Sequence, residues 1–561
     1  MDKRIGVFVC ECGPNIADAV DLDRVIEAIA PLDHVVVAER FGLLCSGAGK
    51  AYLAEKIQEH DLTHFVVGAC SPKQHEPTFM GVCETVGMNP FLFQMANIRE
   101  QIAWITPDKE IATERTIRHL RSALRRVQVH TALEHREIET NPDVLVLGGG
   151  IAGMATATLL GGGGRRVYLV EASDALGGRT AQYARVAPSM IDGGELVRSY
   201  VNAVEANEDI EVLTNTRLED VLGFFGNFIV GLRENVEGAD VRELRVGAVV
   251  VAAGMGPSDP EVLKAAGHGD IPQVMTALDV ERALRSDEVG FGGDDAPGRV
   301  GILHCIGRDD VGYCSEACCA AGMKLAVELR ERYPNAKVTE YVRELSIPGR
   351  PAQLLHERAV AAGVEFVRTA DARVEGGGEG ARVSFTTRNG ESEAREVDLA
   401  ILLPAMRPPS DAQELSLLLG APLGKGGFFA EEHEKTSPVS AVIEGIYLAG
   451  CASGPKGVEE SIAQAEAVAG KVLSGLVPGR RIETEAKTST IAESLCVGCQ
   501  TCLTVCCYGA ISYDETRGVC VVNDVLCKGC GNCAAACPSG AASHQHFTPR
   551  QVYQEIAEIV K

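Results

Sequence analysis

Basic residues are scarce in this sequence of 561 residues, with 53 lysines and arginines against 77 aspartates and glutamates. The formal net charge is −24, and such a charge argues against nucleic acid or an anionic membrane surface as a partner. The first residues, MDKRIGVFVC, show no signal peptide, which argues against a secreted protein. We therefore expect a cytoplasmic chain, whose length suggests three or four domains.

Charge is missing from one stretch, Val144–Gly164, whose 21 residues could span a bilayer. Its glycine clusters and its pattern of a strand, a turn and a helix argue against a membrane span. Asp143, Arg165 and Arg166 place charges at both of its ends. We therefore predict that the chain has no transmembrane segment.

Cysteine, in contrast, is abundant, with 20 residues. Disulfide-rich scaffolds are small and secreted, and neither description fits this chain. Scattered buried thiols are another explanation, but most of these cysteines fall into tight groups. Such groups in a reducing compartment indicate metal ligation.

The last part of the chain contains two cysteine runs of the form C-x2-C-x2-C-x3-C, the second followed by Pro538. This spacing is typical of bacterial ferredoxins with two [4Fe–4S] clusters, in which the fourth cysteine of each run binds the other cluster. Zinc is the alternative, although zinc sites rarely use eight cysteines in two such runs. Cys507 stands where a proline usually follows the first run, and we interpret Cys507 and Cys520 as spare thiols. One cluster is then expected at Cys496, Cys499, Cys502 and Cys537, and the other at Cys527, Cys530, Cys533 and Cys506.

A dinucleotide-binding signature lies at Val144–Gly153, which reads VLVLGGGIAG. Its glycines follow G-x-G-x-x-G between a predicted strand and a predicted helix. A second strand, Val167–Val170, ends at Glu171, where a ribose-binding acid belongs. The helix N-terminus is expected to hold a pyrophosphate. The residues assigned to this site are Gly148, Gly150, Ile151, Ala152, Gly153 and Glu171.

Three further segments favour FAD over NAD. Gly177–Arg179 resembles the Gly-Gly-Arg turn of many FAD-binding oxidoreductases, and Val249–Gly254 (VVVAAG) resembles the second strand-and-glycine motif of the same folds. Ile446–Cys451 (IYLAGC) resembles the segment that reaches the flavin ring, which usually ends in Gly-Asp, so the contact made by Cys451 stays open. The alternative is a fold of this kind without its cofactor. These segments add Gly177, Gly178, Arg179, Gly254, Gly450 and Cys451 to the site.

The predicted strand Arg299–His304 is followed neither by a second G-x-G-x-x-G nor by a redox C-x-x-C or C-x4-C pair, as a pyridine-nucleotide disulfide reductase would require. Four cysteines follow it instead, where the second dinucleotide would sit. Thiolates favour an iron–sulfur cluster at such a site, and we expect it in place of NAD(P)H. The alternative is one thiol–disulfide pair with two bystanders. The four residues are Cys305, Cys314, Cys318 and Cys319.

The first 135 residues alternate short apolar strands with helical patterns, which predicts a small α/β domain with parallel strands. Strands are predicted at Ile5–Cys10, His34–Ala38 and His64–Cys70. Because the carboxyl ends of parallel strands meet at one edge of a sheet, the thiols there could share a fourth cluster, with Cys83 as substitute or spare. The alternative is a set of small buried residues near a domain interface. The expected ligands are Cys10, Cys12, Cys45 and Cys70.

The expected fold class is α/β. A two-lobed, FAD-binding Rossmann-type domain like that of disulfide reductases stands between an N-terminal α/β domain and a C-terminal two-cluster ferredoxin domain. A final helix is expected to dock on its own domain, with partner binding as the alternative. The expected boundaries are 1–135 for the N-terminal domain, 143–477 for the FAD domain, 487–545 for the ferredoxin domain and 548–561 for the helix.

The pattern HCIGRDD…YCSEACC resembles the cluster-binding stretch of heterodisulfide reductase A subunits. AGCASGPKGVEESIAQAEA resembles the late flavin segment of that family, and CECGPNI, ACSPKQHEPTF and NPFLFQMANIREQ fit it as well. The match covers nearly the whole chain. The methanogen members carry a further ferredoxin insert in the flavin domain, and no cysteine between Cys83 and Cys305 supports one here.

The resemblance implies an oxidoreductase subunit with FAD and three or four [4Fe–4S] clusters. FAD can take two electrons together or release them singly, whereas a cluster carries one. The resemblance thus implies electron bifurcation, in which a pair from a donor enzyme is divided between ferredoxin and a higher-potential acceptor. The implied partners are ferredoxin, B- and C-type subunits or an equivalent reductase, a hydrogenase or formate dehydrogenase module, and a second copy of the chain.

No residue resembles a proton-transfer catalyst for an organic substrate, so we assign no catalytic residue and expect the disulfide chemistry in the partners. One alternative is a relay subunit of another complex, such as benzoyl-CoA reductase. A second is a stand-alone ferredoxin–disulfide reductase whose redox thiols are Cys318 and Cys319, or Cys451. A third is a conductive scaffold without bifurcation.

Overall fold

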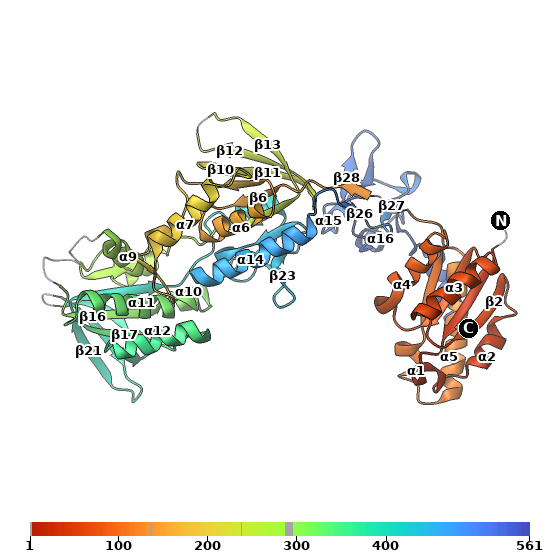
Figure 1. Ribbon diagram of the computed structural model, residues 1–561, viewed down its shortest axis with the longest axis horizontal. Coiled ribbons are helices and arrows are strands. Elements are labelled where there is room, and N and C mark those ends of the chain that lie inside the picture. The colour runs from red at the N-terminus through yellow and green to blue at the C-terminus, as the bar shows by residue number, and fades with distance from the viewer. Residues whose placement is uncertain (1–2, 135–136, 237, 287–295, 378–379, 561) are drawn as a thin grey trace. The chain divides into compact units, whose positions relative to one another are not determined.

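The computed structural model describes residues 3–134, 137–236, 238–286, 296–377 and 380–560. They form two compact units (Figure 1). Unit 1 combines Met1–Ile138 with Glu483–Lys561, and unit 2 is Glu139–Ile482. Among the described residues, no helix is long and apolar enough to cross a membrane.

Unit 1 begins with a parallel sheet of order β2-β1-β3-β4, made of β1 (Ile5–Cys10), β2 (Val35–Phe41), β3 (His64–Ala69) and β4 (Phe93–Asn97). β1 and β3 are buried along their whole length, as expected for parallel strands that are covered on both faces. One face packs on α2 (Leu22–Ile29) and α5 (Lys109–Val127), and the other on α3 (Gly47–Glu59) and α4 (Pro72–Thr85). The three strands predicted from the sequence are confirmed, with the second shifted to Val35–Phe41.

A cysteine-rich module forms the later part of unit 1. Its strands pair as β27 (Ser489–Ile491) with β30 (Ala542–His544) and β28 (Ile511–Asp514) with β29 (Val519–Val522). Each cysteine run contains one short helix, α15 (Thr501–Thr504) or α16 (Asn532–Ala536). The module therefore consists of two similar halves.

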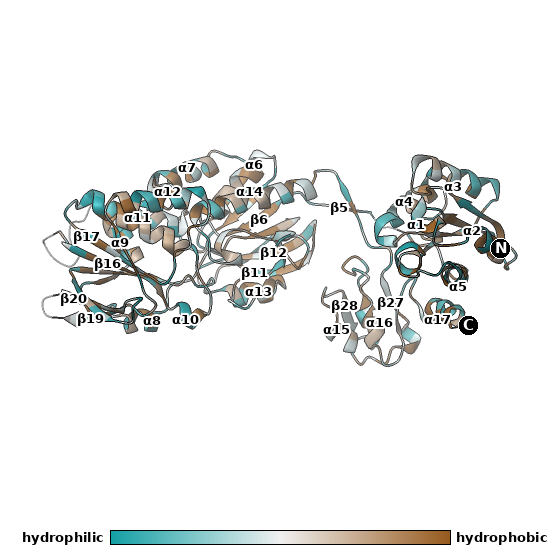
Figure 2. Ribbon diagram, turned by 90° about the horizontal axis from the view of Figure 1, so that it is seen from below, coloured by the Kyte–Doolittle hydropathy of each residue, from teal (hydrophilic) through white to brown (hydrophobic). Residues whose placement is uncertain are grey.

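The last helix, α17 (Pro549–Ile559), begins with a capping box at Thr548 and Gln551. It packs against α5, far away in the sequence (Figure 2). The Arg126 guanidinium pairs with the Glu555 carboxylate at 2.6 Å, and the Ser122 hydroxyl donates to the Glu555 carbonyl oxygen at 2.9 Å. We expected this helix to dock on its own domain, and it packs within unit 1, against α5. Lys561 lies outside the described residues.

The first lobe of unit 2 is built on a seven-stranded sheet of order β10-β7-β6-β14-β25-β24-β23. The antiparallel strands β11 (Thr216–Phe224), β12 (Asn227–Glu234) and β13 (Val241–Val246) form a separate sheet. Helices α6 (Ile151–Gly162) and α14 (Val458–Gly475) pack side by side (Figure 1). The strands of the main sheet are β6 (Val144–Leu147), β7 (Val167–Val170), β10 (Ile210–Leu213), β14 (Ala248–Val251), β23 (Glu431–His433), β24 (Ser437–Ala441) and β25 (Ile446–Leu448).

The second lobe is a five-stranded parallel sheet of order β15-β22-β16-β17-β18. Helix α11 (Ala317–Arg332) packs on β16 and β17 and on α12 (Gly349–Ala361), and α9 (Ala277–Ser286) lies beside α11. This lobe carries the central cysteines. Its strands are β15 (Val274–Thr276), β16 (Arg299–Ile306), β17 (Lys337–Val342), β18 (Glu365–Arg368) and β22 (Leu399–Pro404).

Candidate functional site

The turn between β6 and α6 accommodates little besides glycine. Gly148 has φ +109°, and a Cβ on it would lie 2.3 Å from the Ala252 carbonyl oxygen. A Cβ on Gly153 would lie 1.8 Å from the Gly148 carbonyl oxygen. Gly150 caps α6 without a side chain, and nothing lies within 4 Å of where its Cβ would be. The backbone N–H groups of the first helical turn can therefore bind a pyrophosphate.

Glu171 lies at the end of β7, beside this turn. Its carboxylate accepts hydrogen bonds from the Gly149 N–H at 2.7 Å and from the N–H and hydroxyl of Ser173 at 2.8 and 2.7 Å. These bonds hold the carboxylate next to the start of the helix. That is where the ribose-binding acid of a dinucleotide site belongs.

Two other glycine segments approach the same helix terminus. The Gly177 N–H donates to the Gly149 carbonyl oxygen at 2.9 Å, and a Cβ on Gly178 would lie 3.2 Å from the Gly150 Cα. A Cβ on Gly450 would lie 2.8 Å from the Ala152 Cβ. The structure thus gathers most of the predicted flavin residues here: Gly148, Gly150, Ile151, Ala152, Gly153, Glu171, Gly177, Gly178 and Gly450.

The other predicted flavin residues follow neighbouring strands of the same sheet. The Arg179 guanidinium donates to the Gly256 carbonyl oxygen at 2.7 Å, and Gly254 has φ +73° just after β14. The Cys451 thiol donates to the Lys456 carbonyl oxygen at 3.4 Å, and burial raises the pKa of that thiol. This set of residues fits FAD. Glu171, the open N-terminus of α6 and the segment before α14 follow one another along one edge of the sheet.

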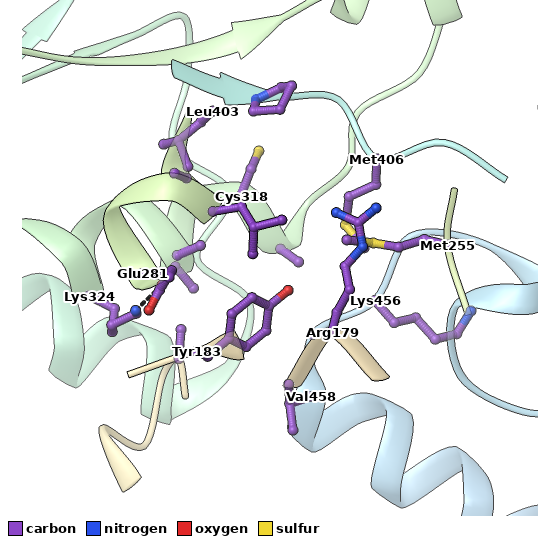
Figure 3. A pocket seen from close by; sticks show the side chains of 18 of the residues that line it. Arg179, Tyr183, Met255, Glu281, Cys318, Lys324, Leu403, Met406, Lys456 and Val458 are labelled. Carbon is purple, nitrogen blue, oxygen red and sulfur yellow. Dashed lines mark hydrogen bonds and ion pairs between the residues drawn. The ribbon is translucent and has the colours of Figure 1, made fainter. Parts of the chain in front are cut away.

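A cavity of about 640 Å³ is lined by residues from both lobes of unit 2 (Figure 3). Tyr183 points its phenol oxygen into it, and burial raises the pKa of that phenol to about 12. A mostly apolar space of this size is typical of cofactor sites. Its wall includes Arg179, Met255, Lys456 and Val458 from the first lobe and Cys318, Leu403 and Met406 from the second.

A buried charged group that was not predicted from the sequence also borders this cavity. The Lys324 ammonium pairs closely with the Glu281 carboxylate and lies 3.1 Å from that of Glu328. The three side chains are between 2% and 7% exposed. Burial raises the pKa of both carboxyl groups, and the Lys324 charge opposes that shift. The i,i+4 spacing of Lys324 and Glu328 is visible in the sequence, but Glu281 comes from another helix.

We expect Lys324→Met to lower the free energy of unfolding of unit 2 by about 3–5 kcal/mol, because it leaves two buried carboxylates without their cation. Denaturant unfolding of the flavin-loaded chain, followed through flavin release, measures this. Lys471→Met, at an exposed position of α14, is the matched control and should change the value by less than about 0.5 kcal/mol. Equal stability of the two variants would show that Lys324 is not needed to balance the carboxylates.

The four central cysteines come together where β16 leads into α11. Cys305 has φ +61° at the end of the strand, and the Cys319 sulfur accepts a hydrogen bond from the Ser346 N–H at 3.4 Å. The pKa of Cys318 is raised, first by its contact with Cys319 and by burial, and then by the nearby sulfurs of Cys305 and Cys314. Cys318 also lines the cavity. The set can therefore surround a cluster next to the cavity.

A buried histidine adjoins these thiols and was also missed. The His304 imidazole lies 2.8 Å from the Glu340 carboxylate, with both side chains fully buried. Burial by itself lowers the pKa of His304, but hydrogen bonds to Cys319 and Glu340 raise it to about 9. The wall of the central cysteine group is thus polar as well as sulfur-rich.

The C-terminal module brings its eight predicted ligands together in two groups. Site 1 is a small cavity lined by Cys496, Cys499, Cys502 and Cys537, and site 2 is one lined by Cys506, Cys527, Cys530 and Cys533. The fourth cysteine of each run thus lies with the other run. Each thiolate of a cubane binds a different iron. Among the described residues, no group of three or more His, Cys, Asp or Glu side chains is placed to hold a metal ion.

The two remaining thiols of the module differ. Cys507 is exposed, whereas Cys520 is 3% exposed and lines site 1 beside the four predicted ligands. Cys520 thus borders site 1, and its interpretation as a thiol that does not bind the cluster stays a prediction. The sequence pattern could not assign it, because Cys520 lies on a strand outside both runs.

The predicted N-terminal ligands also come together. The pKa of Cys10 is raised by burial and then by the sulfurs of Cys12 and Cys45, and that of Cys70 is raised to about 11 by burial, with Cys45 adding to it. Cys83 is fully buried in α4 and packs in the same apolar core.

Arg99 stands beside this N-terminal group. It lies in a π-helical turn, and its guanidinium donates to the Cys12 sulfur at 3.1 Å. The chain thus places a permanent positive charge next to the thiols, and this charge opposes the burial that raises the pKa of Cys70.

Two protein families match the chain. "Pyridine nucleotide-disulphide oxidoreductase" matches residues 142–466, and "4Fe-4S dicluster domain" matches residues 495–541. These matches cover the two-lobed unit and the cysteine-rich module. The chain thus has an FAD-binding disulfide-reductase fold and a C-terminal module for [4Fe–4S] clusters.

Curated relatives are similar along almost the whole chain. The second iron–sulfur A subunit of CoB–CoM heterodisulfide reductase in Methanopyrus kandleri is 32% identical over 92% of this chain and 92% of its own length. The A subunit of the H(2):CoB–CoM heterodisulfide, ferredoxin reductase of Methanothermobacter thermautotrophicus is 30% identical over 99% and 97%. Among solved structures, thioredoxin reductase of T. acidophilum has a TM-score of 0.43 and 15% identity over 59% of this chain and 97% of its own.

Proposed function

This chain belongs to the family of CoB–CoM heterodisulfide reductase A subunits, and from that premise we propose that it divides electron pairs at an FAD between two one-electron routes. It is an oxidoreductase subunit that transfers electrons between flavin and iron–sulfur clusters. In the proposal, a donor enzyme supplies a pair of electrons; one leaves for ferredoxin and the other for a partner reductase.

One observation carries this proposal. A single cavity is bordered by the first turn of α14 and Arg179 on the flavin side and by Cys318 on the other side. A flavin ring in that cavity would adjoin a cluster held by Cys305, Cys314, Cys318 and Cys319. A cluster in the second lobe would stand where a nicotinamide otherwise binds, and one-electron transfer would then replace hydride transfer.

The residues of this chain bind and orient the cofactor. FAD, when bound, exchanges two electrons together or one at a time, whereas each cluster carries one. The N-terminus of α6 binds the pyrophosphate and Glu171 the adenosine ribose. The buried ion pair of Lys324 and Glu281 lines the same cavity.

In the proposal, electrons enter or leave the chain through the C-terminal module. Site 1 and site 2 each hold a [4Fe–4S] cluster and exchange electrons with a partner, such as the ferredoxin that the names of several relatives include. Further proposed partners are B- and C-type subunits, a hydrogenase or formate dehydrogenase module, and a second copy of this chain.

A stopped-flow experiment tests the proposal. The reconstituted full chain is mixed anaerobically with reduced ferredoxin, and the visible absorbance of flavin and clusters is followed. We expect both to bleach, because the clusters pass electrons to the flavin. Bleached clusters beside an oxidised flavin would contradict the proposal.

The N-terminal thiols are proposed to hold a fourth cluster through Cys10, Cys12, Cys45 and Cys70. Four clusters require about 16 iron atoms per chain, and three require about 12. We expect Cys70→Ala to remove about four iron atoms, because it opens one corner of the site. Iron and acid-labile sulfide analysis of the reconstituted chain measures this.

Cys83→Ala is the control for this count, since Cys83 is buried in the same core and is not one of the four proposed ligands. It should keep the iron content of the unaltered chain. Equal iron in Cys70→Ala and the unaltered chain would show that these thiols hold no cluster. A loss confined to Cys83→Ala would give Cys83 the place of a ligand.

A further inference from the structure

The two halves of the C-terminal module carry different residues at one equivalent position. Ser489 precedes Cys496, the first cysteine of its run, by seven residues, and Cys520 precedes Cys527 by seven. Ser489 starts β27, and Cys520 lies in β29. Both residues are 3% exposed. The internal repeat therefore places a hydroxyl in one half where the other half has a thiol.

Each of these residues contacts the same two ligand positions, with the halves exchanged. The Ser489 N–H donates to the Cys527 sulfur at 3.4 Å, and its hydroxyl oxygen lies 3.2 Å from the Cys533 sulfur. The Cys520 N–H donates to the Cys496 sulfur at 3.5 Å, and its side chain packs with Cys502 in the wall of site 1. Ser489 thus serves site 2 as Cys520 serves site 1: each contacts the first and third cysteines of a run.

One backbone donor to a ligand sulfur is matched between the two sites. The Ala510 N–H donates to the Cys506 sulfur at 3.3 Å in site 2, and the Ala542 N–H donates to the Cys537 sulfur at 3.4 Å in site 1. Ser539 lies near Cys537 at 3.6 Å, but at a partly exposed position where water competes. The buried side chains beside the ligands therefore differ between the two sites: site 2 has the hydroxyl of Ser489 where site 1 has the thiol of Cys520.

Hydrogen bonds to the sulfurs of a cluster are among the factors that set its reduction potential. The reduced cluster carries one more negative charge, so a donor stabilises it and raises the potential. A ligand cysteine is a thiolate and accepts only, so the bond between Ser489 and Cys533 must then be donated by the hydroxyl. A hydroxyl is a better donor than a thiol.

We propose that Ser489 and Cys520 are a pair of tuning residues that raise the potential of site 2 relative to that of site 1. The proposal rests on the ligation of clusters at the two sites. The difference in potential favours electron transfer in one direction within the module, from site 1 to site 2.

Exchanging the two side chains tests this. In the full reconstituted chain, Cys520→Ser should raise the potential of one cluster, and Ser489→Cys should lower that of the other. We expect each change to raise the ratio of electron occupancy at site 1 to that at site 2 about tenfold. For one-electron couples this corresponds to a change of about 59 mV in the difference between the two potentials. The double exchange should add the two shifts. An anaerobic titration followed by EPR measures all three variants.

Ser543→Cys is the matched control, because Ser543 lies on β30, beside Thr490 of β27, and its hydroxyl bonds to Thr490. It should move neither potential. Full iron content with unshifted potentials in Cys520→Ser and Ser489→Cys would overturn the tuning while leaving the ligation intact. A shift of the same couple by both variants, or a shift of the opposite sign, would also overturn it. Iron loss in Cys520→Ser would make Cys520 a ligand and overturn the proposal.

Discussion

Gly153→Ala is expected to abolish stable FAD binding while leaving the iron of the C-terminal module in place. The added Cβ would lie 1.8 Å from the Gly148 carbonyl oxygen, which is backbone and belongs to the same turn. Overpacking costs about 1–3 kcal/mol even where side chains can move, and each 1.4 kcal/mol is about tenfold in affinity. Because this contact can be relieved only by opening the turn, we expect a loss of roughly 100-fold in FAD affinity. Flavin content after gel filtration and titration of the apoprotein with FAD measure it.

Gly162→Ala is the control for this change. Gly162 ends the same helix, and nothing lies within 4 Å of where its Cβ would be. The control should bind FAD as the unaltered chain does and have the same circular dichroism. Normal FAD affinity in Gly153→Ala would contradict the placement of the pyrophosphate at the N-terminus of α6.

Cys318→Ala is expected to remove one cluster and to disconnect the flavin from the C-terminal clusters. Cys318 lines the cavity and lies among Cys305, Cys314 and Cys319. Losing it should release about four iron atoms per chain and leave FAD bound, since the α6 terminus is untouched. Rapid mixing with reduced ferredoxin should then bleach the C-terminal clusters without bleaching the flavin.

Cys507→Ala is the control for the central change, because Cys507 is exposed and belongs to none of the proposed ligand sets. It should keep the iron and the flavin bleaching of the unaltered chain. If Cys318→Ala kept full iron and still passed electrons to the flavin, the central cysteines would not hold a cluster. Reduction of a disulfide by the isolated chain, lost in Cys318→Ala, would instead support the alternative of a disulfide reductase.

The sequence predicts well what depends on local spacing. β1 and β3 are continuous apolar runs, and the turn at Gly148–Gly153 follows from its glycines and from Glu171 one strand later. The crossed grouping of Cys506 and Cys537 follows from the spacing of two runs in one module. In these cases the residues that determine the structure are near one another in the chain.

The sequence does not predict contacts between distant segments. The packing of α17 on α5 depends on Arg126 and Glu555, which no local pattern connects. Glu281 meets Lys324 only because α9 and α11 are neighbours in the second lobe. Cys520 is outside both runs, and only the pairing of β28 with β29 brings it to site 1.

An anaerobic redox titration of the reconstituted full chain, followed by visible and EPR spectra, tests the central claim most directly. The claim is that the flavin divides electron pairs, which requires its second electron to be taken up more easily than its first. The account predicts that the flavin is reduced in one two-electron step, while the clusters are reduced singly. Two well-separated one-electron steps of the flavin would contradict it and make the chain a one-electron relay.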